Sequence, residues 1–496
     1  MDENKTTSPN SGEPPSGRPA SGSFGSYLDR RGFLRTSVAA GAGAGLSLTS
    51  KSATAQEANK VLKVALVGCG AQGKALMDSA RTDTTMDGTY EMTAVCDVWG
   101  SNRTRMERTL KAYKHPARPY VDITEMLEKE KDLDAVMIAS PDWMHAPHTI
   151  EALEAGKAVY CEKMMSNTIE AARTMVKAQE RTGGVLQIGH QRRSNPRYLH
   201  LRNNCVLGDQ IFGRLTHAYA QWNRAVSKPY SWPDGSEIDD ATLTKYGYDS
   251  MEEFRNWRWY KKYGGGPISD LGAHQIDLFN WIFDARPTSV MASGGIDYYT
   301  KENGLFDIEH EDNVMAIYEY EKPGEMTRRA YYQVLTTTSS QGFYEKFMGE
   351  YGTASISENP SINQAYREGA APSWDAYAAK GLIVKDPATV VNHHKFWQQP
   401  KTWPGPHLPS KWLGTKQITD VRESKGLDPW ELPITLDVRP HAPHIKVFFE
   451  AARANDPAVV NCTVQDAFAT CVTVLTAINS VRTGEKVKFK PDDFLA

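Results

Sequence analysis

The chain has 496 residues, of which 24% are charged and 40% hydrophobic, and its formal net charge is −3. Because the sequence has no basic cluster, this charge balance argues against a nucleic acid partner. The length suits two ordinary domains behind an N-terminal extension, and the apolar stretch in that extension is too short and too rich in glycine to predict a membrane span.

The first 55 residues have the organisation of an export signal. A long polar segment leads to a twin-arginine pair, Arg30 and Arg31, and a mildly apolar stretch follows at residues 38–48. Residues 53–55, Ala-Thr-Ala, form a small-residue cleavage site. A disordered tail with a chance pair of arginines is the alternative. We expect a twin-arginine signal peptide over residues 1–55, export in the folded state, and a periplasmic or other extracytoplasmic location.

Residues 61–73 predict a strand, a glycine turn and the start of a helix, the arrangement that a dinucleotide site needs. The apolar run ends in Gly68-x-Gly70-x-x-Gly73, where one glycine permits the tight turn, one admits the pyrophosphate and one lets helix and strand pack closely. The N-terminus of the helix then offers free N–H groups to the phosphates. We expect the cofactor to bind at Gly68, Gly70, Ala71, Gln72 and Gly73.

A second predicted strand, residues 90–96, ends in Asp97. An acid at this position accepts hydrogen bonds from the ribose hydroxyls of NAD and repels the 2′-phosphate of NADP. We therefore predict NAD as the cofactor, while Arg103 is close enough in the sequence to leave NADP open.

Strands and helices continue to alternate as far as residue 189, which predicts a doubly wound parallel sheet, a Rossmann domain, over residues 60–189. Further strands are expected at residues 134–140, 158–161 and 185–189, and helices at residues 149–155 and 169–182. Sheets of this kind bind ligands outside the carboxyl ends of their strands. That edge is where the sequence places Gly68, Asp97, Pro141, Glu162 and His190.

The pattern changes after His190, and residues 190–496 predict a second domain with one face toward the cofactor. Five segments have the alternation of strands in a mixed or antiparallel sheet, at residues 215–222, 290–294, 314–320, 328–334 and 345–349. Residues 357–435 are rich in Pro, Trp, His and Lys with weak periodicity, so we expect an ordered insertion there. This insertion and the segment after Gln56 are candidate covers for the cleft. Helices are expected at residues 448–454 and 464–481.

Four motifs together give the chain a resemblance to the Gfo/Idh/MocA family, which includes glucose–fructose oxidoreductase and inositol dehydrogenase. They are the glycine motif, Ser140-Pro141-Asp142-x-x-His145, residues 156–163 ending in Cys161-Glu162-Lys163, and residues 264–277, GGGPISDLGAHQID. The resemblance extends from residue 63 to residue 489 apart from the insertion. It implies an α/β fold in which a Rossmann domain is joined to an α/β domain with a large, open, mostly antiparallel sheet. It also implies a homo-oligomer that oxidises or reduces a hydroxyl of a small saccharide or polyol.

The resemblance carries over a catalytic trio, Lys163, Asp270 and His274. Oxidation of a secondary alcohol needs a group that takes the hydroxyl proton and donors that orient the oxygen. His274 is a candidate base, and Lys163 supplies positive charge to the developing alkoxide, although the lysine is a candidate base as well. Asp270 and His274 are four positions apart, so a helix over residues 271–283 would present both from one face.

One residue departs from the family pattern, and a structural reading of the trio stays open. The family has Pro after Glu-Lys, where it fixes the turn that aims the lysine, and this chain has Met164. Without a catalytic role, Asp270 would be a helix cap, His274 a packed residue and Lys163 a surface residue.

Further site residues are expected on both sides of the cleft. The resemblance places Pro141, His145, Glu162 and Lys163 at the cofactor. Residues expected to contact the substrate are polar side chains near the cleft and aromatic rings that stack on sugar faces, namely His190, Arg192, Trp222, Trp257 and Tyr260. An exposed polar loop for the first two and core packing for the three rings are the alternatives.

We expect neither a metal site nor a disulfide framework. Four histidines outside the motifs lack the spacing of any known zinc motif, namely His393, His394, His441 and His444. The six cysteines include no CxxC pair, and three of them fall within or beside buried strands.

Two functions from different classes follow from this pattern. The first is net oxidation or reduction of a secondary hydroxyl on a sugar, glycoside or polyol. Because the periplasm has no dependable supply of free nicotinamide nucleotide, we expect the cofactor to be held tightly and regenerated in place. The alternative is an NAD-assisted glycoside hydrolase or lyase that works by transient oxidation and elimination. Relatives with that activity carry a motif different from Asp270-x-x-x-His274, which favours the first function, and the complete trio argues against a binding protein with a degenerate site.

Overall fold

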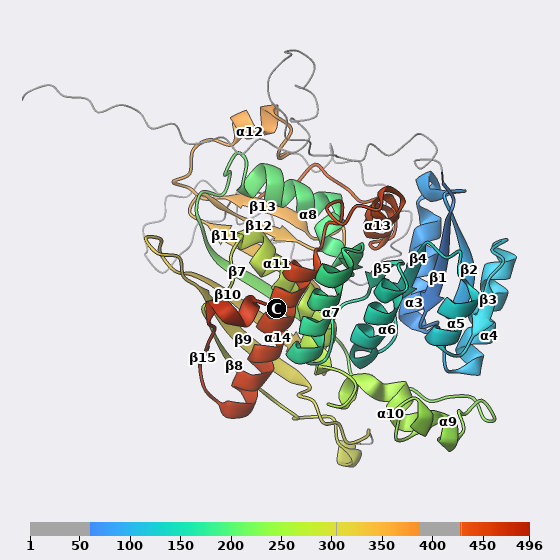
Figure 1. Ribbon diagram of the computed structural model, residues 1–496. Helices are drawn as coiled ribbons and strands as arrows, with labels where there is room; N and C mark the ends of the chain where they lie inside the picture. The colour runs from blue at the N-terminus through green and yellow to red at the C-terminus, as the bar shows by residue number, and fades with distance from the viewer. Residues whose placement is uncertain (1–59, 304, 386–426, 428) are drawn as a thin grey trace, which may run out of the picture. The chain divides into compact units, whose positions relative to one another are not determined.

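The computed structural model describes three parts of the chain: residues 60–385, with the exception of residue 304; residue 427; and residues 429–496. Figure 1 shows two sheets, the first in the blue and teal part of the chain and the second in the green to red part. The expected signal peptide, the segment after Gln56 and residues 386–426 of the expected insertion lie outside the described residues.

The first sheet is parallel throughout and has the strand order β3-β2-β1-β4-β5-β6. Its strands are short and largely apolar, as expected for a parallel sheet covered by helices on both faces: β1 (Leu62–Val67), β2 (Tyr90–Cys96), β3 (Arg118–Tyr120), β4 (Ala135–Ile138), β5 (Ala158–Cys161) and β6 (Leu186–Ile188). The helices are α3 (Ala71–Thr82), α4 (Gly100–Ala112), α5 (Ile123–Lys129), α6 (Asp142–Glu154) and α7 (Ile169–Thr182). From β1 to β3 the strands are added toward one edge of the sheet, and from β4 to β6 they are added toward the other. The point between β1 and β4 where this order reverses is where doubly wound sheets bind ligands.

Local signals decide several of these bounds. The side chain of Thr168 accepts a hydrogen bond from the N–H of Ala171 at the start of α7, and Gly183 ends that helix in the left-handed conformation, with φ of +63°. The predicted helix over residues 169–182 is therefore confirmed at both ends. The helix expected at residues 149–155 is longer than predicted, because α6 already begins at Asp142 and includes Pro147.

The second sheet has nine strands in the order β14-β13-β12-β11-β7-β10-β9-β8-β15, and all its pairs are antiparallel except β7 with β10. Its strands are β7 (Leu215–Asn223), β8 (Ser289–Gly295), β9 (Asn313–Tyr320), β10 (Arg328–Leu335), β11 (Phe343–Gly349), β12 (Gly352–Ile356), β13 (Asn363–Arg367), β14 (Pro429–Trp430) and β15 (Val487–Lys488). All five strands predicted from alternation are present, and the expected α/β fold with a large, mostly antiparallel second sheet is confirmed.

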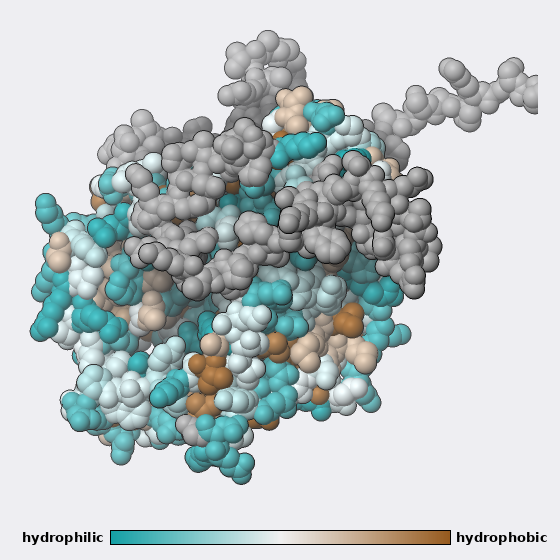
Figure 2. Space-filling view, turned by 180° about the vertical axis from the view of Figure 1, so that it is seen from behind, coloured by the Kyte–Doolittle hydropathy of each residue, from teal (hydrophilic) through white to brown (hydrophobic). Residues whose placement is uncertain are grey.

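Alternation along β9 shows how this sheet divides core from solvent. Val314, Ala316 and Tyr318 are buried, whereas Met315 and Ile317 between them are exposed. Figure 2 shows hydrophobic residues on the presented face in small groups among hydrophilic ones. The oligomeric state of the chain stays a prediction.

The sheet extends into the segment predicted as an insertion at residues 357–435. Strand β13 pairs with β12, and the short β14 pairs with β13 in turn. Between them lies α12 (Asp375–Ala379), and the rings of Trp374 and Trp430 are buried with their centroids 5.9 Å apart. The described ends of this segment therefore add β13 and the edge strand β14 to the second sheet.

Two helices cover the buried face of the second sheet, α11 (Ala273–Phe283) and α14 (Val464–Thr483), and α14 also packs against α7 of the first domain. Among the described helices, α14 alone is long and apolar enough to cross a membrane, and 67% of its apolar window is buried inside the protein. The six cysteines are free and buried.

Helix α13 (Ala442–Ala454) comes late in the chain but packs against α3 of the first domain, as Figure 1 shows. Phe448 and Phe449 belong to the same hydrophobic core as the strands of the parallel sheet, and the ring of Phe449 lies 4.9 Å from that of Tyr90. Residues near the C-terminus thus complete the core of the N-terminal domain.

A second segment also crosses between the domains. Residues 224–263, which we call the arch, leave the sheet after β7, contain α9 (Asp240–Lys245) and α10 (Met251–Asn256), and pack against the first domain. Figure 1 shows α9 and α10 on the side of α6 that faces away from α13.

Candidate active site

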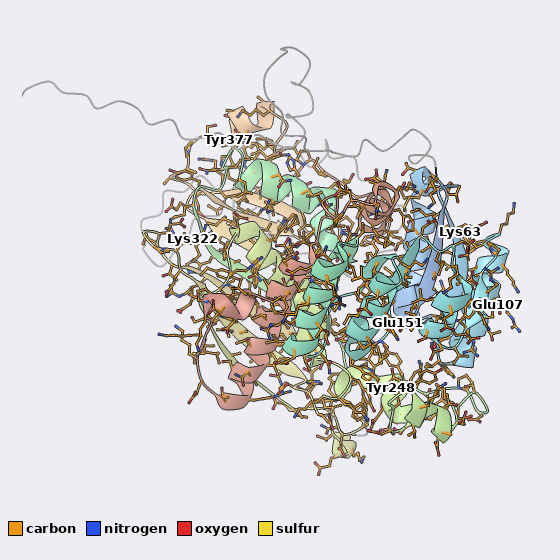
Figure 3. The ribbon with its side chains drawn as sticks, in the orientation of Figure 1. Lys63, Glu107, Glu151, Tyr248, Lys322 and Tyr377 are labelled. Atoms are coloured by element: carbon orange, nitrogen blue, oxygen red, sulfur yellow. The ribbon has the colours of Figure 1, made fainter. Side chains whose placement is uncertain are left out.

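A cavity of about 770 Å³ lies between the parallel sheet and the buried face of the second sheet. The carboxyl ends of β1, β2, β4 and β5 supply one wall, and β7, α11 and the arch supply the other. Its volume is typical of cavities that bind cofactors and small molecules. Glu151 of α6 and Tyr248 of the arch, both labelled in Figure 3, line the same cavity from opposite domains.

The glycine loop forms a cradle that larger residues could not. Gly68 has a φ of +89°, and a Cβ atom there would lie 2.5 Å from the carbonyl of Ala139. A Cβ at Gly73 would lie 2.0 Å from the carbonyl oxygen of Gly68, so Gly73 allows α3 to pack on the turn without itself lining the cavity. Gly68, Gly70, Ala71 and Gln72 line it directly. These residues fit a pyrophosphate group at the start of α3.

Asp97 lines the cavity and also holds the glycine loop. Its carboxylate accepts hydrogen bonds from the N–H groups of Cys69 at 2.7 Å and Trp99 at 2.8 Å. Burial raises the pKa of Asp97, and these hydrogen bonds partly counter that effect. Arg103, which left NADP open, donates to the carbonyl oxygen of Asp97 at 2.6 Å. Its guanidinium is therefore engaged with the backbone.

The residues predicted at the other end of the cofactor also line the cavity. Gln72 donates to the carboxylate of Glu162 at 3.1 Å and lies 3.1 Å from Nε2 of His441, which the sequence did not place here. His145 has its ring nitrogens 2.6 Å and 2.7 Å from the carbonyl oxygens of Met164 and Ser140. Since both nitrogens face backbone carbonyls, His145 ties the end of β4 to the end of β5.

Lys163 and Asp270 meet across the two domains. Nζ of Lys163 donates to the carbonyl oxygen of Asp270 and lies 3.5 Å from its carboxylate, and the side chains are 10% and 22% exposed. Nε of Arg258 lies 3.2 Å from the same carboxylate. Burial would raise the pKa of Asp270, but the charges of Arg258 and Lys163 outweigh it and hold that pKa well below its ordinary value. Although Met164 replaces the proline of the family pattern, Lys163 reaches the cavity.

His274 lies in the first turn of α11 and lines the cavity beside Trp222, with ring centroids 5.9 Å apart. Burial and the positive charges of Lys163 and Arg192 lower the pKa of His274 far below its ordinary value. The imidazole is therefore neutral near pH 7, so one ring nitrogen keeps a free lone pair. The α-helix predicted over residues 271–283 begins at Ala273, and Asp270 lies in the π-helical turn before it, Ile268–Gly272; both side chains line the same cavity.

Asp142 is a cavity residue to which the sequence assigned no role. It is 5% exposed at the start of α6, and burial raises its pKa to about 7, with Lys163 opposing and Asp270 adding to the shift. The signal was present, since Asp142 stands within the motif after β4. A carboxyl with this pKa changes its charge near neutral pH, beside the lysine and the histidine.

The wall opposite the cofactor combines stacked rings with polar groups. The rings of Trp222 and Phe343 stack with centroids 4.5 Å apart. Glu358 lines the cavity next to them and accepts hydrogen bonds from Gln191 at 3.1 Å and from Arg192 at 3.0 Å. An aromatic platform beside hydrogen-bonding groups suits a hydroxylated ring.

Three residues expected to contact the substrate do not line the cavity, whereas Trp222 and Trp257 do. Arg192 turns inward, because Glu345 and Glu358 accept its hydrogen bonds. His190 is buried 3.9 Å from Asp277, and Tyr260 donates to Glu252 at 3.1 Å. The roles of His190, Arg192 and Tyr260 as substrate contacts stay predictions. Among the described residues, no three His, Cys, Asp or Glu side chains gather as a metal site.

Two models of one oxidoreductase family match the chain. The oxidoreductase family with an NAD-binding Rossmann fold matches residues 62–190, and the GFO/IDH/MocA C-terminal domain matches residues 207–353. Together they account for more than half of the chain.

Curated relatives include the inositol 2-dehydrogenase of Salmonella typhimurium, 32% identical over 173 residues, which are 35% of this chain and 49% of the relative. The 4-carboxy-2-hydroxymuconate-6-semialdehyde dehydrogenase of a Sphingobium species is 28% identical over 177 residues, which are 35% of this chain and 53% of the relative. The chain thus spans about half the length of the curated relatives it matches.

Solved structures extend the likeness over most of the fold. The WlbA dehydrogenase of Bordetella pertussis, in complex with NADH and UDP-GlcNAcA, superposes with a TM-score of 0.58 at 18% identity over 88% of this chain and 99% of that one. A levoglucosan dehydrogenase in complex with NADH and L-sorbose gives 0.59 at 14% identity, over 88% of this chain and 100% of that one. At such identities the likeness shows the fold.

The raised pKa of Asp142 leads to a stability prediction. The neutral carboxyl is favoured in the folded state, so the stability penalty is absent below about pH 4, grows as the pH rises toward 7 and is complete above it. Since one pKa unit corresponds to about 1.36 kcal/mol, the penalty reaches roughly 4 kcal/mol at most. We expect Asp142→Asn to raise the Tm at pH 8 and to leave it nearly unchanged at pH 4.5.

Thermal unfolding of wild type and variant at the two pH values, at equal nucleotide occupancy, checks this. Asp234→Asn, which changes an exposed carboxylate of the arch, is the matched control and should show no pH-dependent difference from wild type. A shift of equal size at both pH values for Asp142→Asn would argue that its carboxyl is ionised as usual.

Proposed function

The chain belongs to the Gfo/Idh/MocA oxidoreductase family, and from that premise we propose that it is an exported NAD-dependent oxidoreductase with a retained cofactor. Its substrate is a sugar, glycoside or polyol, oxidised or reduced at a secondary hydroxyl. One observation carries this proposal: Lys163 from the cofactor domain and Asp270 from the second domain meet beside His274, in the cavity that the glycine loop lines.

Each residue of the trio has a task that its surroundings support. The neutral imidazole of His274 accepts the hydroxyl proton. The ammonium of Lys163 orients the substrate oxygen and stabilises the negative charge that develops on it. Asp270, held ionised by Arg258 and Lys163, positions that ammonium. NAD, when bound along Gly68, Gly70 and Asp97, supplies the hydride acceptor.

The proposed substrate class is supported by the relatives and by the cavity wall opposite the cofactor site. The relatives and structural neighbours include proteins named for inositol and levoglucosan, and one neighbour was solved with L-sorbose. Trp222 stacked on Phe343 offers a platform for such a ring, and Glu358 accepts hydrogen bonds from ring hydroxyls. The stacked rings and the carboxylate of this wall favour a hydroxylated ring as the substrate.

Removing either reacting group should slow turnover without emptying the cofactor site. We expect Lys163→Ala and His274→Ala each to reduce kcat by roughly 10² to 10⁴, the usual contribution of a positioned acid or base. Lys177→Ala and His217→Ala, which change the same residue types at exposed positions, are matched controls and should turn over like wild type. Rates are measured on a panel of inositol, levoglucosan and L-sorbose. Near-normal rates for either site variant would remove that residue from the chemistry.

Retention of the cofactor makes a separate prediction. In a compartment without free nucleotide, the enzyme must regenerate its cofactor in place through a second substrate or within one cycle. We expect bound nucleotide to survive extensive dialysis, to be NAD when released, and to support turnover of a sugar without added NAD. Dialysed protein that is free of nucleotide and needs millimolar NAD would contradict retention, and released NADP would contradict the role of Asp97. Product analysis separates an oxidised or reduced sugar from the cleaved glycoside that an NAD-assisted hydrolase would release.

Export follows from the twin-arginine pattern, which lies outside the described residues. We expect replacement of Arg30 and Arg31 by lysine to leave the precursor in the cytoplasm, because the export machinery reads the arginine pair. Cell fractionation with detection of the precursor and mature forms measures this. Arg18→Lys, in the polar segment before the motif, is the matched control. Undiminished periplasmic delivery of the double variant would show that the pair is not an export signal.

A further inference from the structure

Hydrogen bonds attach the arch to the first domain at the carboxyl edge of the parallel sheet. Nε1 of Trp99 donates to the carbonyl oxygen of Ser236 at 2.5 Å, and the N–H of Trp143 donates to the carbonyl oxygen of Tyr263 at 3.3 Å. The hydroxyl of Tyr246 lies 3.4 Å from the carboxylate of Asp122. These first-domain residues follow β2, β4 and β3, so the arch crosses the edge where the cofactor binds.

Aromatic packing reinforces these attachments. Trp143 contacts the rings of Tyr248 and Tyr263, with centroids 5.6 Å and 5.5 Å away. Trp99, Leu243 and Tyr248 are buried in the same hydrophobic cluster. The arch therefore packs against the first domain through a separate hydrophobic cluster. Separation of the arch from that domain would expose large rings to water.

The cavity-facing side of the arch lies at the end of the cofactor site that Asp97 marks. Tyr248, Phe254 and Arg255 of the arch line the cavity together with Asp97. The guanidinium of Arg255 lies 4.6 Å from the ring centroid of Trp99, whose N–H is bound to the carboxylate of Asp97. Arg255 is thus next to the acid that recognises the adenosine ribose.

We propose that the arch closes over the adenosine half of bound NAD and that Arg255 contacts the dinucleotide. A guanidinium offers positive charge to the pyrophosphate and a planar face to the adenine. The nucleotide then leaves only when the arch separates from Trp99 and Trp143. We therefore place a cover that retention requires in residues 224–263. This inference rests on the proposed function only in that NAD is the molecule retained.

Two glycines of the arch provide a matched pair of variants. Gly247 has a φ of +81°, and a Cβ there would lie 2.6 Å from Cη2 of Trp143, so Gly247→Ala pushes the arch off that ring. Gly235 has a φ of +74°, and a Cβ there would meet nothing within 4 Å. Gly235→Ala introduces the same kind of backbone strain, but its added Cβ meets no atom of the first domain.

The experiment measures how fast purified full-length holoenzyme loses its nucleotide during dialysis, by the absorbance of the retained fraction. We expect Gly247→Ala and Arg255→Ala to lose nucleotide roughly tenfold faster than wild type or more, since weakened contacts act mainly on dissociation. Gly235→Ala should match wild type. Saturating added NAD should restore turnover to Gly247→Ala, because Lys163 and His274 are untouched.

Equal dissociation rates for Gly247→Ala, Gly235→Ala and wild type would overturn the closure by the arch. An unchanged rate for Arg255→Ala alone would overturn the contact of this residue with the dinucleotide. If dialysed wild type is free of nucleotide, the retention of the cofactor is contradicted. Closure by the arch is then tested by the Kd for added NAD, measured by calorimetric titration. A higher Kd for Gly247→Ala than for Gly235→Ala supports the closure, and equal values overturn it. If Gly247→Ala does not fold, Arg255→Ala, which changes a partly buried side chain, decides the proposal, and an unchanged rate of nucleotide loss then overturns it.

Discussion

Lys163 and Asp270 are opposite charges held together across the boundary of two domains, and both are largely removed from water. A charge in such a place is costly unless a partner neutralises it. The end of β5 and the turn before α11 must therefore stay together for either charge to be buried. The position of the glycine loop relative to Trp222 and His274 depends on this contact.

The protonation states of the neighbouring groups follow from the same contact. Two cations beside Asp270 keep it ionised, while burial and the charge of Lys163 keep His274 neutral. Asp142 shares the cavity, and burial moves its pKa to about 7. Groups of ordinary type thus acquire separate pKa values within one cavity, which is how active sites hold an acid and a base side by side.

Chain segments far apart in sequence complete the cofactor domain. Helix α13 adds Phe448 and Phe449 to the core of the parallel sheet, and the arch seats its rings on Trp99 and Trp143. The nucleotide-binding edge is therefore not a property of residues 60–189 alone. A ligand that binds between such segments contacts both domains in the folded state alone, and such binding stabilises the folded state.

Local patterns in the sequence determined the elements and the cofactor loop. The strand at residues 90–96, the helix at residues 169–182 and the glycine cradle depend on neighbours within a few positions, through alternation, capping and the absence of a Cβ atom. The motif spacing likewise placed Lys163 and His274 in one cavity.

Only the tertiary structure decided which side chains face that cavity. Arg192 was expected to meet the substrate, but Glu345 and Glu358, each more than 150 positions away, turn it into the core. Glu358 reaches the cavity from the loop after β12, and Arg255 reaches it from the arch, and neither residue belongs to a recognisable motif. Burial and charge pairing are set by residues that are distant in the chain, and a single sequence carries no local signal for them.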